Sequence, residues 1–318
     1  MEVDAQMAMG MPARGRVVRK TGRKDARAEK KEWTAYLFLL PCLLFIGVLS
    51  YYPAVRALVG AFTSWNGVGA ASWVGLSNFV HALQSQTFRS SVVHILIWAV
   101  IGIPLGLIPP FAIAEAIFRL KSGRSQYIYR TLFILPVILP GVVGILIWFF
   151  FFEPGGVIDS FLSSIGFPAL ANQPWLADPH TALWALILMG FPWIGAFNLL
   201  IYYAGLQGIS AEILDAAAVD GCSWWKRMTR IDIPLVMSQT KLLIVLSVIG
   251  VAQVLIQPLL MTGGGPGTST MTPVLYMYQA AIDRDQYGYS MGVAFILFVV
   301  LLALTVLNMK YFRTDSDV

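Results

Sequence analysis

Long apolar runs separated by short polar segments dominate the chain. A transmembrane helix needs about 20 mostly apolar residues, and six runs have that length. They cover residues 34–52, 91–118, 131–152, 181–206, 242–261 and 289–309. None shows the alternation of a membrane β-strand, and lipid offers no partner to the backbone of an irregular segment. The pattern therefore predicts an all-α, polytopic membrane protein with six transmembrane helices.

Composition removes the soluble alternatives. Hydrophobic residues make up 57% of the chain and charged residues 12%, whereas soluble domains carry about 25% charged residues. So few charges cannot cover a water-exposed surface of this size. The two cysteines are too few for a secreted disulfide scaffold, and such an apolar sequence is incompatible with disorder.

The basic residues indicate the orientation in the membrane. Of the 22 Lys and Arg residues, 19 lie in residues 1–33, 119–130, 207–241 and the C-terminal end. The other 3 are Arg56, Arg89 and Arg284, on the opposite side of the six spans. Because cytoplasmic segments of membrane proteins retain Lys and Arg, both termini are predicted to be cytoplasmic.

The spans divide the chain into four parts. Residues 1–33 are a basic cytoplasmic tail, and residues 34–90 hold the first helix and an extracytoplasmic loop. Residues 91–310 form the transmembrane core, with a cytoplasmic segment at 207–238, and residues 311–318 are a second cytoplasmic tail. No small-x-small cleavage site follows the first run, so that helix is predicted to stay uncleaved. Topology and attraction to anionic lipid explain the basic tail better than nucleic-acid binding does.

The residues that would carry enzyme chemistry are missing from the sequence. Only His94 and Glu115 are ionisable within the runs, and both lie near an end, with Glu115 beside Arg119. The sequence has no phosphate-binding G-x-x-x-x-G-K-[ST] loop, no H-E-x-x-H and no paired-cysteine metal spacing. We therefore predict a chain that is not an enzyme and that binds no metal and no cofactor of its own.

The cytoplasmic segment carries a short amphipathic helix. Ser210 is a candidate N-cap, and Glu212 and Asp215 suit the positive end of the helix dipole. An apolar stripe follows at helical spacing, Gly221 is a helix stop, and Pro234 breaks the chain before the fifth span. Trp224 and Trp225, followed by basic residues, suit a second amphipathic stretch at the membrane surface. Two interpretations of the short helix are open: it enters a partner's groove, or it lies on lipid.

The same segment carries a recognisable motif. Asp215-Ala216-Ala217, then Gly221, then Ile231-x-Ile233-Pro234 resembles the E-A-A…G…I-x-L-P signature of ABC importer permeases, with the same spacing. Asp215 replaces Glu and Ile233 replaces Leu. Further collinear landmarks include Trp73-Val-Gly-Leu-Ser-Asn-Phe79, Arg130-Thr-Leu-Phe-Ile-Leu-Pro136 and Thr262-Gly-Gly-Gly-Pro-Gly267. Together they resemble the carbohydrate-uptake branch, specifically the first-permease subunit similar to that of maltose and glycerol-phosphate importers.

The resemblance implies a type I ABC importer permease fold in a bacterial-type cytoplasmic (inner) membrane. It also implies a heterodimer with a second permease, two ABC ATPase subunits that bind ATP and Mg, an extracytoplasmic binding protein and a carbohydrate substrate. The helix at 212–221 would seat in a cleft of an ATPase subunit. The residues that the resemblance assigns to this coupling are Glu212, Asp215, Ala216, Ala217, Gly221 and Pro234.

Polar and aromatic residues in the apolar runs are candidates for the substrate pathway, which has to be reachable from both sides of the membrane. These are Gly190, Trp193, Ser247, Gln253 and Gln257. Pro192 interrupts the fourth span there, Trp193 could stack on a sugar ring, and Gln253 and Gln257 form an i, i+4 pair. Gly190, Trp193 and Ser247 match sugar-contact positions of the similar maltose importer. The alternative is that these side chains pack or hydrogen-bond between helices.

The sequence thus predicts a membrane-spanning permease subunit that forms half of the pathway of an ATP-driven sugar or oligosaccharide importer. A non-conducting structural or assembly subunit of a membrane complex is the second hypothesis, and a channel is the third.

Overall fold

The computed structural model of the chain describes residues 25–311. Residues 1–24 of the predicted basic tail and residues 312–318 of the predicted C-terminal tail lie outside the described residues. The regular elements of the described residues are helices and one short hairpin, in which β1 (Thr63–Ser64) pairs antiparallel with β2 (Ser72–Trp73).

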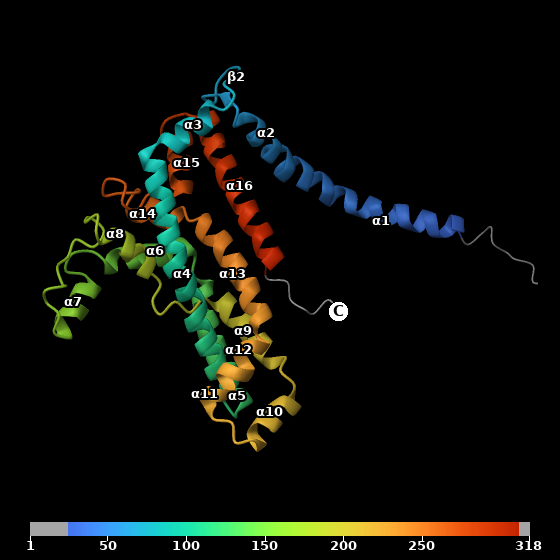
Figure 1. Cartoon of the computed structure of the whole chain (residues 1–318), viewed down its shortest axis with the longest axis vertical. Helices are drawn as coiled ribbons and strands as arrows, with labels where there is room; N and C mark the ends of the chain where they lie inside the picture. Colours follow the sequence, from blue (N-terminus) through green and yellow to red (C-terminus); the bar gives the residue numbers. More distant parts are fainter. Residues whose placement is uncertain (1–24, 312–318) are drawn as a thin grey trace, which may run out of the picture. The chain divides into compact units, whose positions relative to one another are not determined.

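The helices follow one another in the order shown in Figure 1. The first half contains α1 (Asp25–Ile46), the π-helical turn η1 (Gly47–Tyr51), α2 (Tyr52–Gly60), α3 (Ser77–Gln84), α4 (Gln86–Phe118), α5 (Gly123–Ile134), the 3-10 turn η2 (Leu135–Ile138), α6 (Gly141–Phe151) and α7 (Val157–Ser164). The second half contains α8 (Ala182–Leu188), α9 (Ala196–Gln207), α10 (Ala211–Val219), α11 (Trp224–Arg227), the π-helical turn η3 (Met228–Asp232), α12 (Ile233–Leu235), α13 (Met237–Ala252), α14 (Ile256–Met261), α15 (Pro273–Ile282) and α16 (Tyr287–Tyr311).

Four helical runs among the described residues are long and apolar enough to cross a membrane. They are Tyr36–Gly60, Gln86–Phe118, Met237–Met261 and Tyr287–Val306. These runs correspond to the first, second, fifth and sixth predicted spans. Their presence agrees with the prediction of a polytopic helical membrane protein.

The third predicted span, 131–152, is not one straight helix. The segments Gly123–Ile138 and Gly141–Phe151 are long and apolar enough only when taken together, and they meet at 88°. Pro136 and Pro140 lie at this bend, and a proline removes a helical N–H donor and clashes with the preceding turn. The third predicted span is therefore sharply bent at its prolines.

The fourth predicted span, 181–206, is also broken. Helix α8 ends at Leu188 and α9 begins at Ala196, with a non-helical segment between them. Pro192 lies in that segment, and both Gly190 and Trp193 have positive φ, at 92° and 57°. A residue in the left-handed region cannot continue a right-handed helix, and the break agrees with the interruption of the fourth span predicted at Pro192.

The chain consists of two compact units, Met1–Arg56 and Ala57–Val318. In the first unit, no described side chain between residues 36 and 56 is buried. An apolar helix without a buried face requires lipid or another protein around it. The second unit contains the core and every site described below.

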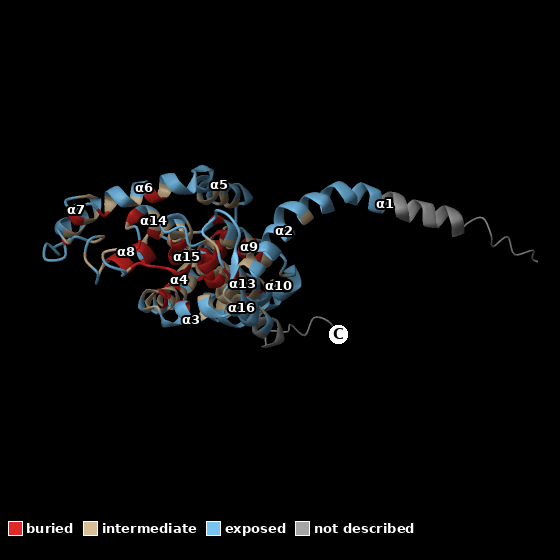
Figure 2. Cartoon of the chain, turned by 90° about the horizontal axis from the view of Figure 1, so that it is seen from above, coloured by how far each residue is buried: buried red, intermediate tan, exposed pale blue. Residues whose placement is uncertain are grey.

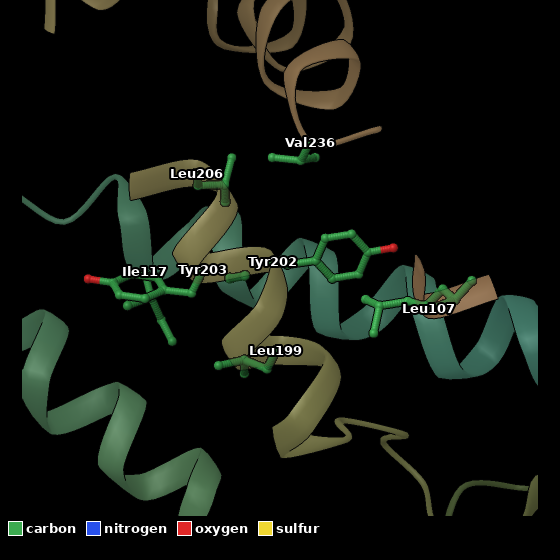
Figure 3. Close-up of a cluster of buried hydrophobic side chains, with 9 residues drawn as sticks. Leu107, Ile117, Leu199, Tyr202, Tyr203, Leu206 and Val236 are labelled. Carbon is green, nitrogen blue, oxygen red and sulfur yellow. The ribbon is translucent and has the colours of Figure 1, made fainter. Parts of the chain in front are cut away.

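Helices α9 and α13 pack along α4 to form the largest hydrophobic cluster of the second unit. Figure 3 shows Leu199, Tyr202 and Leu206 of α9 in this cluster, together with Leu107 and Ile117 of α4 and Val236. A second cluster joins α3, α4, α15 and α16, and a third joins α4, α6, α8 and α14. Helix α4 thus contributes to every one of the three clusters, through Leu107, Phe88 and Trp98.

Asp159 of α7 fixes the connection between α6 and α8. Its carboxylate is 2% exposed and accepts hydrogen bonds from the Trp175 indole at 2.9 Å and the Gly155 amide at 2.8 Å. Burial alone would raise the pKa of Asp159, but these bonds and one from the Asn172 amide outweigh it and hold the pKa below its ordinary value. Trp175 therefore has a structural role in this loop.

Candidate substrate cavity and coupling segment

The break between α8 and α9 holds a half-buried aromatic side chain, Trp193, in a fixed orientation. Pro192 has no N–H to donate to the carbonyl of Leu188, four residues earlier. The indole Nε1 of Trp193 donates to that carbonyl instead, at 3.2 Å. The Trp193 ring also meets Phe191 edge-on at 5.1 Å, so both the backbone and the neighbouring ring orient it.

A cavity of about 360 Å³ opens beside this loop. Three of the five predicted pathway residues, Gly190, Trp193 and Gln257, line it. Its opposite wall is α4, where the small residues Gly102 and Gly106 leave space. The structure therefore joins residues from the fourth and fifth predicted spans at one cavity.

Asn198 also lines the cavity, although it is not among the predicted pathway residues. Its Nδ2 donates to the carbonyl of Gly106 at 2.7 Å, which Pro110 deprives of the usual i+4 donor. Asn198 thus ties α9 to the proline-containing part of α4. An amide in an otherwise apolar run is the sequence signal that identifies such a residue.

The other two predicted pathway residues lie elsewhere. Ser247 is half-buried on α13 and Gln253 is exposed, and neither lines the cavity. Helix α13 ends at Ala252 and α14 begins at Ile256, so the predicted helical i, i+4 pairing of Gln253 with Gln257 is wrong. Pro258 accounts for the break, because the Val254 carbonyl that it leaves free accepts a hydrogen bond from the Thr272 hydroxyl at 2.8 Å.

The cavity suits an uncharged ligand with hydroxyl groups. Trp98 and Trp193 supply aromatic surface, and Gln257 and Asn198 supply amides. None of the residues that line it is ionisable, so it offers neither a proton relay nor a counter-ion. The searched residues also contain no group of His, Cys, Asp and Glu that could hold a metal ion.

The predicted short cytoplasmic helix is α10, which begins one residue before Glu212 and ends two residues before Gly221. Gly221 has φ of +64°, and the Cys222 amide reaches back to the Ala217 carbonyl at 3.0 Å, which closes the helix end. Ser210 occupies the N-cap position, but its side chain makes no capping hydrogen bond.

Most residues of α10 are exposed, as Figure 2 shows. Glu212, Asp215 and Ala216 are exposed, as is Val219 at 88%. Ala217 is the one buried position of α10. Ala216 therefore lies on a face that a partner could approach, whereas Ala217 packs within this chain.

Ion pairs fasten the segment that follows α10 to the end of α4. Asp232 of η3 is fully buried and pairs with Arg119, just after α4, at 3.1 Å and with Arg227 of α11 at 3.3 Å. Arg119 also pairs with Glu115 and lies over the Trp224 ring, 5.4 Å from its centre. Pro234 lies in α12, directly after this cluster and before α13. Arg227 thus has a defined partner in addition to its contribution to the basic charge.

The fold and the cavity define a multi-pass helical membrane protein with a ligand-sized space between its helices. Residues 102–312 match the family of the binding-protein-dependent transport system inner membrane component. The match covers more than half of the chain, so the chain belongs to this family.

Individual relatives agree with that assignment. The arabinooligosaccharides transport system permease protein AraP of Bacillus subtilis (strain 168) is 27% identical, and the match covers 92% of each chain. The sn-glycerol-3-phosphate transport system permease protein UgpA of Yersinia enterocolitica is 28% identical over 88% of this chain and 94% of its own length. The predicted resemblance to ABC importer permeases is confirmed.

A solved structure supports the fold. A chain of a bacterial alginate ABC transporter, in complex with an alginate pentasaccharide-bound periplasmic protein, has a TM-score of 0.77 and 22% identity. The match covers 92% of this chain and 99% of that one. The predicted type I ABC importer permease fold is therefore confirmed.

The buried Asp232 generates a prediction about stability. The substitution Asp232→Ala removes the ion-pair partner of Arg227 and one of the two ion-pair partners of Arg119, which keeps only Glu115. We expect the free energy of unfolding to fall by about 3–5 kcal/mol, the usual cost of breaking a buried ion pair on one side. The measurement is thermal unfolding of the purified chain in detergent. Asp283→Ala, at an exposed position, is the control and should change stability by about 0.5 kcal/mol or less; equal effects would contradict the buried cluster.

Proposed function

We propose that this chain forms one half of the translocation pathway of an ATP-driven importer of sugars or oligosaccharides. The observation that carries the proposal is the cavity at the α8–α9 break, where Trp193 and Gln257 meet without an ionisable neighbour. Aromatic rings and amides match the apolar faces and hydroxyl groups of a neutral sugar. The relative named for arabinooligosaccharides points to the same substrate class.

We further propose six membrane crossings with both termini in the cytoplasm of a bacterial-type inner membrane. The four long apolar runs account for four crossings, and the bent segment Gly123–Phe151 accounts for a fifth. The broken pair α8 and α9 supplies the sixth, because non-helical backbone at membrane depth is tolerated where it lines a cavity. The Lys and Arg distribution supports this orientation.

The complete importer would contain a second permease, two ABC ATPase subunits and an extracytoplasmic binding protein. Its carbohydrate would pass between the two permeases, and ATP hydrolysis would occur on the ATPases rather than on this chain. Helix α10 is the docking element for an ATPase subunit, since it presents Glu212, Asp215, Ala216 and Val219 outward. An exposed short helix of this kind suits a groove in a partner.

A physical connection from α10 to the cavity supports coupling. The segment after α10 is joined to the end of α4 through Asp232 and Arg119. Helix α4 continues through the membrane to Gly102 and Gly106, which line the cavity. A displacement of α10 by an ATPase would therefore reach the cavity wall through α4. A non-conducting assembly subunit, the alternative, requires neither this connection nor a lined cavity.

Two glutamines four residues apart in the sequence, one in the cavity and one outside it, give a test of the pathway. Gln257→Leu removes an amide from the cavity, whereas Gln253→Leu changes an exposed side chain outside it. Loss of one hydrogen bond to a neutral ligand costs about 1 kcal/mol. We expect sugar uptake by vesicles to fall about 3- to 10-fold for the first variant and to stay near the wild-type rate for the second.

Uptake should be compared at equal amounts of assembled complex. Equal effects of the two substitutions, or lost assembly with Gln257→Leu alone, would favour the assembly-subunit alternative over a substrate pathway.

Gly221 provides the test of docking. Its Cβ would meet no atom within 4 Å, so Gly221→Leu causes no clash inside this chain, but leucine at positive φ costs about 1–2 kcal/mol. Distortion of the end of α10 should lower the recovery of ATPase subunits about tenfold. The measurement is affinity purification of the tagged chain from mildly solubilised membranes, with mass spectrometry of the proteins that copurify.

Gly75→Leu is the matched control, because Gly75 has φ of +58° and equally open space but lies outside the segment around α10. It should leave ATPase recovery unchanged. Undiminished recovery and transport with Gly221→Leu would contradict docking through α10, and a wild-type chain that copurifies with no ATPase would contradict the importer itself.

A further inference from the structure

A small polar pocket of about 240 Å³ lies where the β1–β2 hairpin, α3 and the start of α16 come together (Figure 1). Each side chain that lines it can form hydrogen bonds. The pocket shares no lining residue with the cavity at the α8–α9 break, and it is smaller than the range of about 300–1,000 Å³ that is usual for drug-sized ligands. It therefore forms a separate candidate site with room for one small ligand.

Hydrogen bonds fix the floor of the pocket, which consists of the buried or half-buried side chains of Trp65, Asn78 and Tyr289. The Asn78 Nδ2 donates to the carbonyls of Ala61 and Thr63, both at 2.9 Å. The Trp65 indole donates to a backbone carbonyl at 3.2 Å, and the Tyr289 hydroxyl shares a 2.8 Å hydrogen bond with another tyrosine. A floor held in this way loses little conformational freedom when a ligand binds.

The rim of the pocket is exposed and carries both hydrogen-bond donors and acceptors. It consists of a hydroxyl, two amides, an imidazole and a carboxylate, from Ser64, Asn66, Gln286, His81 and Asp285. A cation requires acceptors alone, and the Asp285 carboxylate repels an anion. Hydroxyl groups both donate and accept hydrogen bonds, so this mixture matches a neutral ligand with several hydroxyl groups.

We infer that the pocket binds one neutral sugar ring of the carbohydrate substrate, at the end of the chain that the proposed orientation puts outside the cytoplasm. The ring lies against the Trp65 indole, and its hydroxyl groups bond to Asp285, Gln286 and His81. The His81 ring is itself held against Tyr289, with the ring centres 4.8 Å apart. The choice of a sugar rests on the proposed function, and the substrate would meet this chain twice, at this surface and in the cavity.

A thiol at the rim reports whether the pocket is occupied. Ser64→Cys is nearly isosteric, and Cys42→Ser and Cys222→Ser remove the native thiols. The purified complex is treated with a maleimide in the presence of the methyl glycoside of D-glucose, D-galactose or L-arabinose. We expect at least one glycoside, at about 50 mM, to slow the labelling of the rim thiol about threefold or more, because a bound ring covers it.

Ser163→Cys in the same background is the matched control. Ser163 is exposed on α7 and does not line the pocket, so its labelling should stay unchanged. If no glycoside slows the labelling of Ser64→Cys, or if both thiols are slowed equally, the inference is wrong.

Two neighbouring aspartates test the proposed contact. Asp283 and Asp285 are both exposed, but only Asp285 lines the pocket. Asparagine keeps the size of the side chain and tolerates the φ of 52° at Asp285. With Asp285→Asn, the concentration of the protecting glycoside that halves the labelling rate should rise about tenfold. Protection by methyl β-D-glucuronide, an anion that the native carboxylate repels, should increase. Asp283→Asn should change neither, and equal effects of the two substitutions would contradict the contact.

Sugar uptake by vesicles distinguishes failure of this inference from failure of the proposed function. Uptake without protection of the rim thiol would remove the surface site and leave the importer standing. Protection without uptake would leave the surface site standing and remove the importer. Gln257→Leu, which changes only the cavity, should lower uptake and leave protection of the rim thiol intact. Loss of protection in that variant would show that the sugar acts from the cavity, and the inference would be wrong.

Discussion

A proline within a membrane helix leaves one backbone carbonyl without its N–H donor, and that carbonyl has to find another donor away from water. This constraint recurs at three places in the chain. The Asn198 side chain donates a hydrogen bond to the Gly106 carbonyl, which Pro110 leaves free. The Trp193 indole donates to the Leu188 carbonyl, four residues before Pro192. The Thr272 hydroxyl donates to the Val254 carbonyl, four residues before Pro258. Each donor comes from a side chain, so each proline site fixes a polar or aromatic group at a defined place in the interior.

The cavity forms where two of these side-chain donors, Asn198 and Trp193, come together. Because the Asn198 amide nitrogen and the Trp193 indole nitrogen already donate to backbone carbonyls, a ligand finds the Asn198 oxygen, the tryptophan faces and the Gln257 amide. A cavity with so few free polar groups has to recognise its ligand largely by ring stacking and shape. In the proposed importer, the ligand-binding chemistry of this chain would therefore rest on Trp193 and Gln257.

The sequence identifies those properties that depend on composition and local spacing. Apolar length predicts the runs at Gln86–Phe118 and Tyr287–Val306, and turn chemistry predicts the end of α10 at Gly221. Breaks in a helix are harder to place, because a proline such as Pro258 can either kink a helix or end it, depending on donors from distant segments. In α13 the helix ends, because Thr272 donates a hydrogen bond to the Val254 carbonyl. Helical spacing extended past Ala252 therefore puts Gln253 on the wrong side relative to Gln257.

The ion-pair cluster could not be predicted for a related reason. Arg119 and Asp232 are 113 residues apart in sequence, and nothing local indicates that the end of α4 meets η3. The basic residues near Arg227 are sufficiently explained by orientation in the membrane. Only the packing of α4 against α9 and α13 brings the two carboxylates and two guanidinium groups together.

Helix α4 connects the ion-pair cluster to the cavity. Its end is held by the ion pairs of Arg119, and Gly102 and Gly106 form the cavity wall about 20 Å away at 1.5 Å per residue. Pro104, Pro109 and Pro110 lie between or beside them, where the helical hydrogen-bond ladder is incomplete. A force applied at Arg119 therefore bends α4 most easily next to the cavity, while Asn198 keeps that stretch attached to α9. The prolines that require side-chain donors inside the membrane thus also place the incomplete part of the α4 hydrogen-bond ladder beside the cavity.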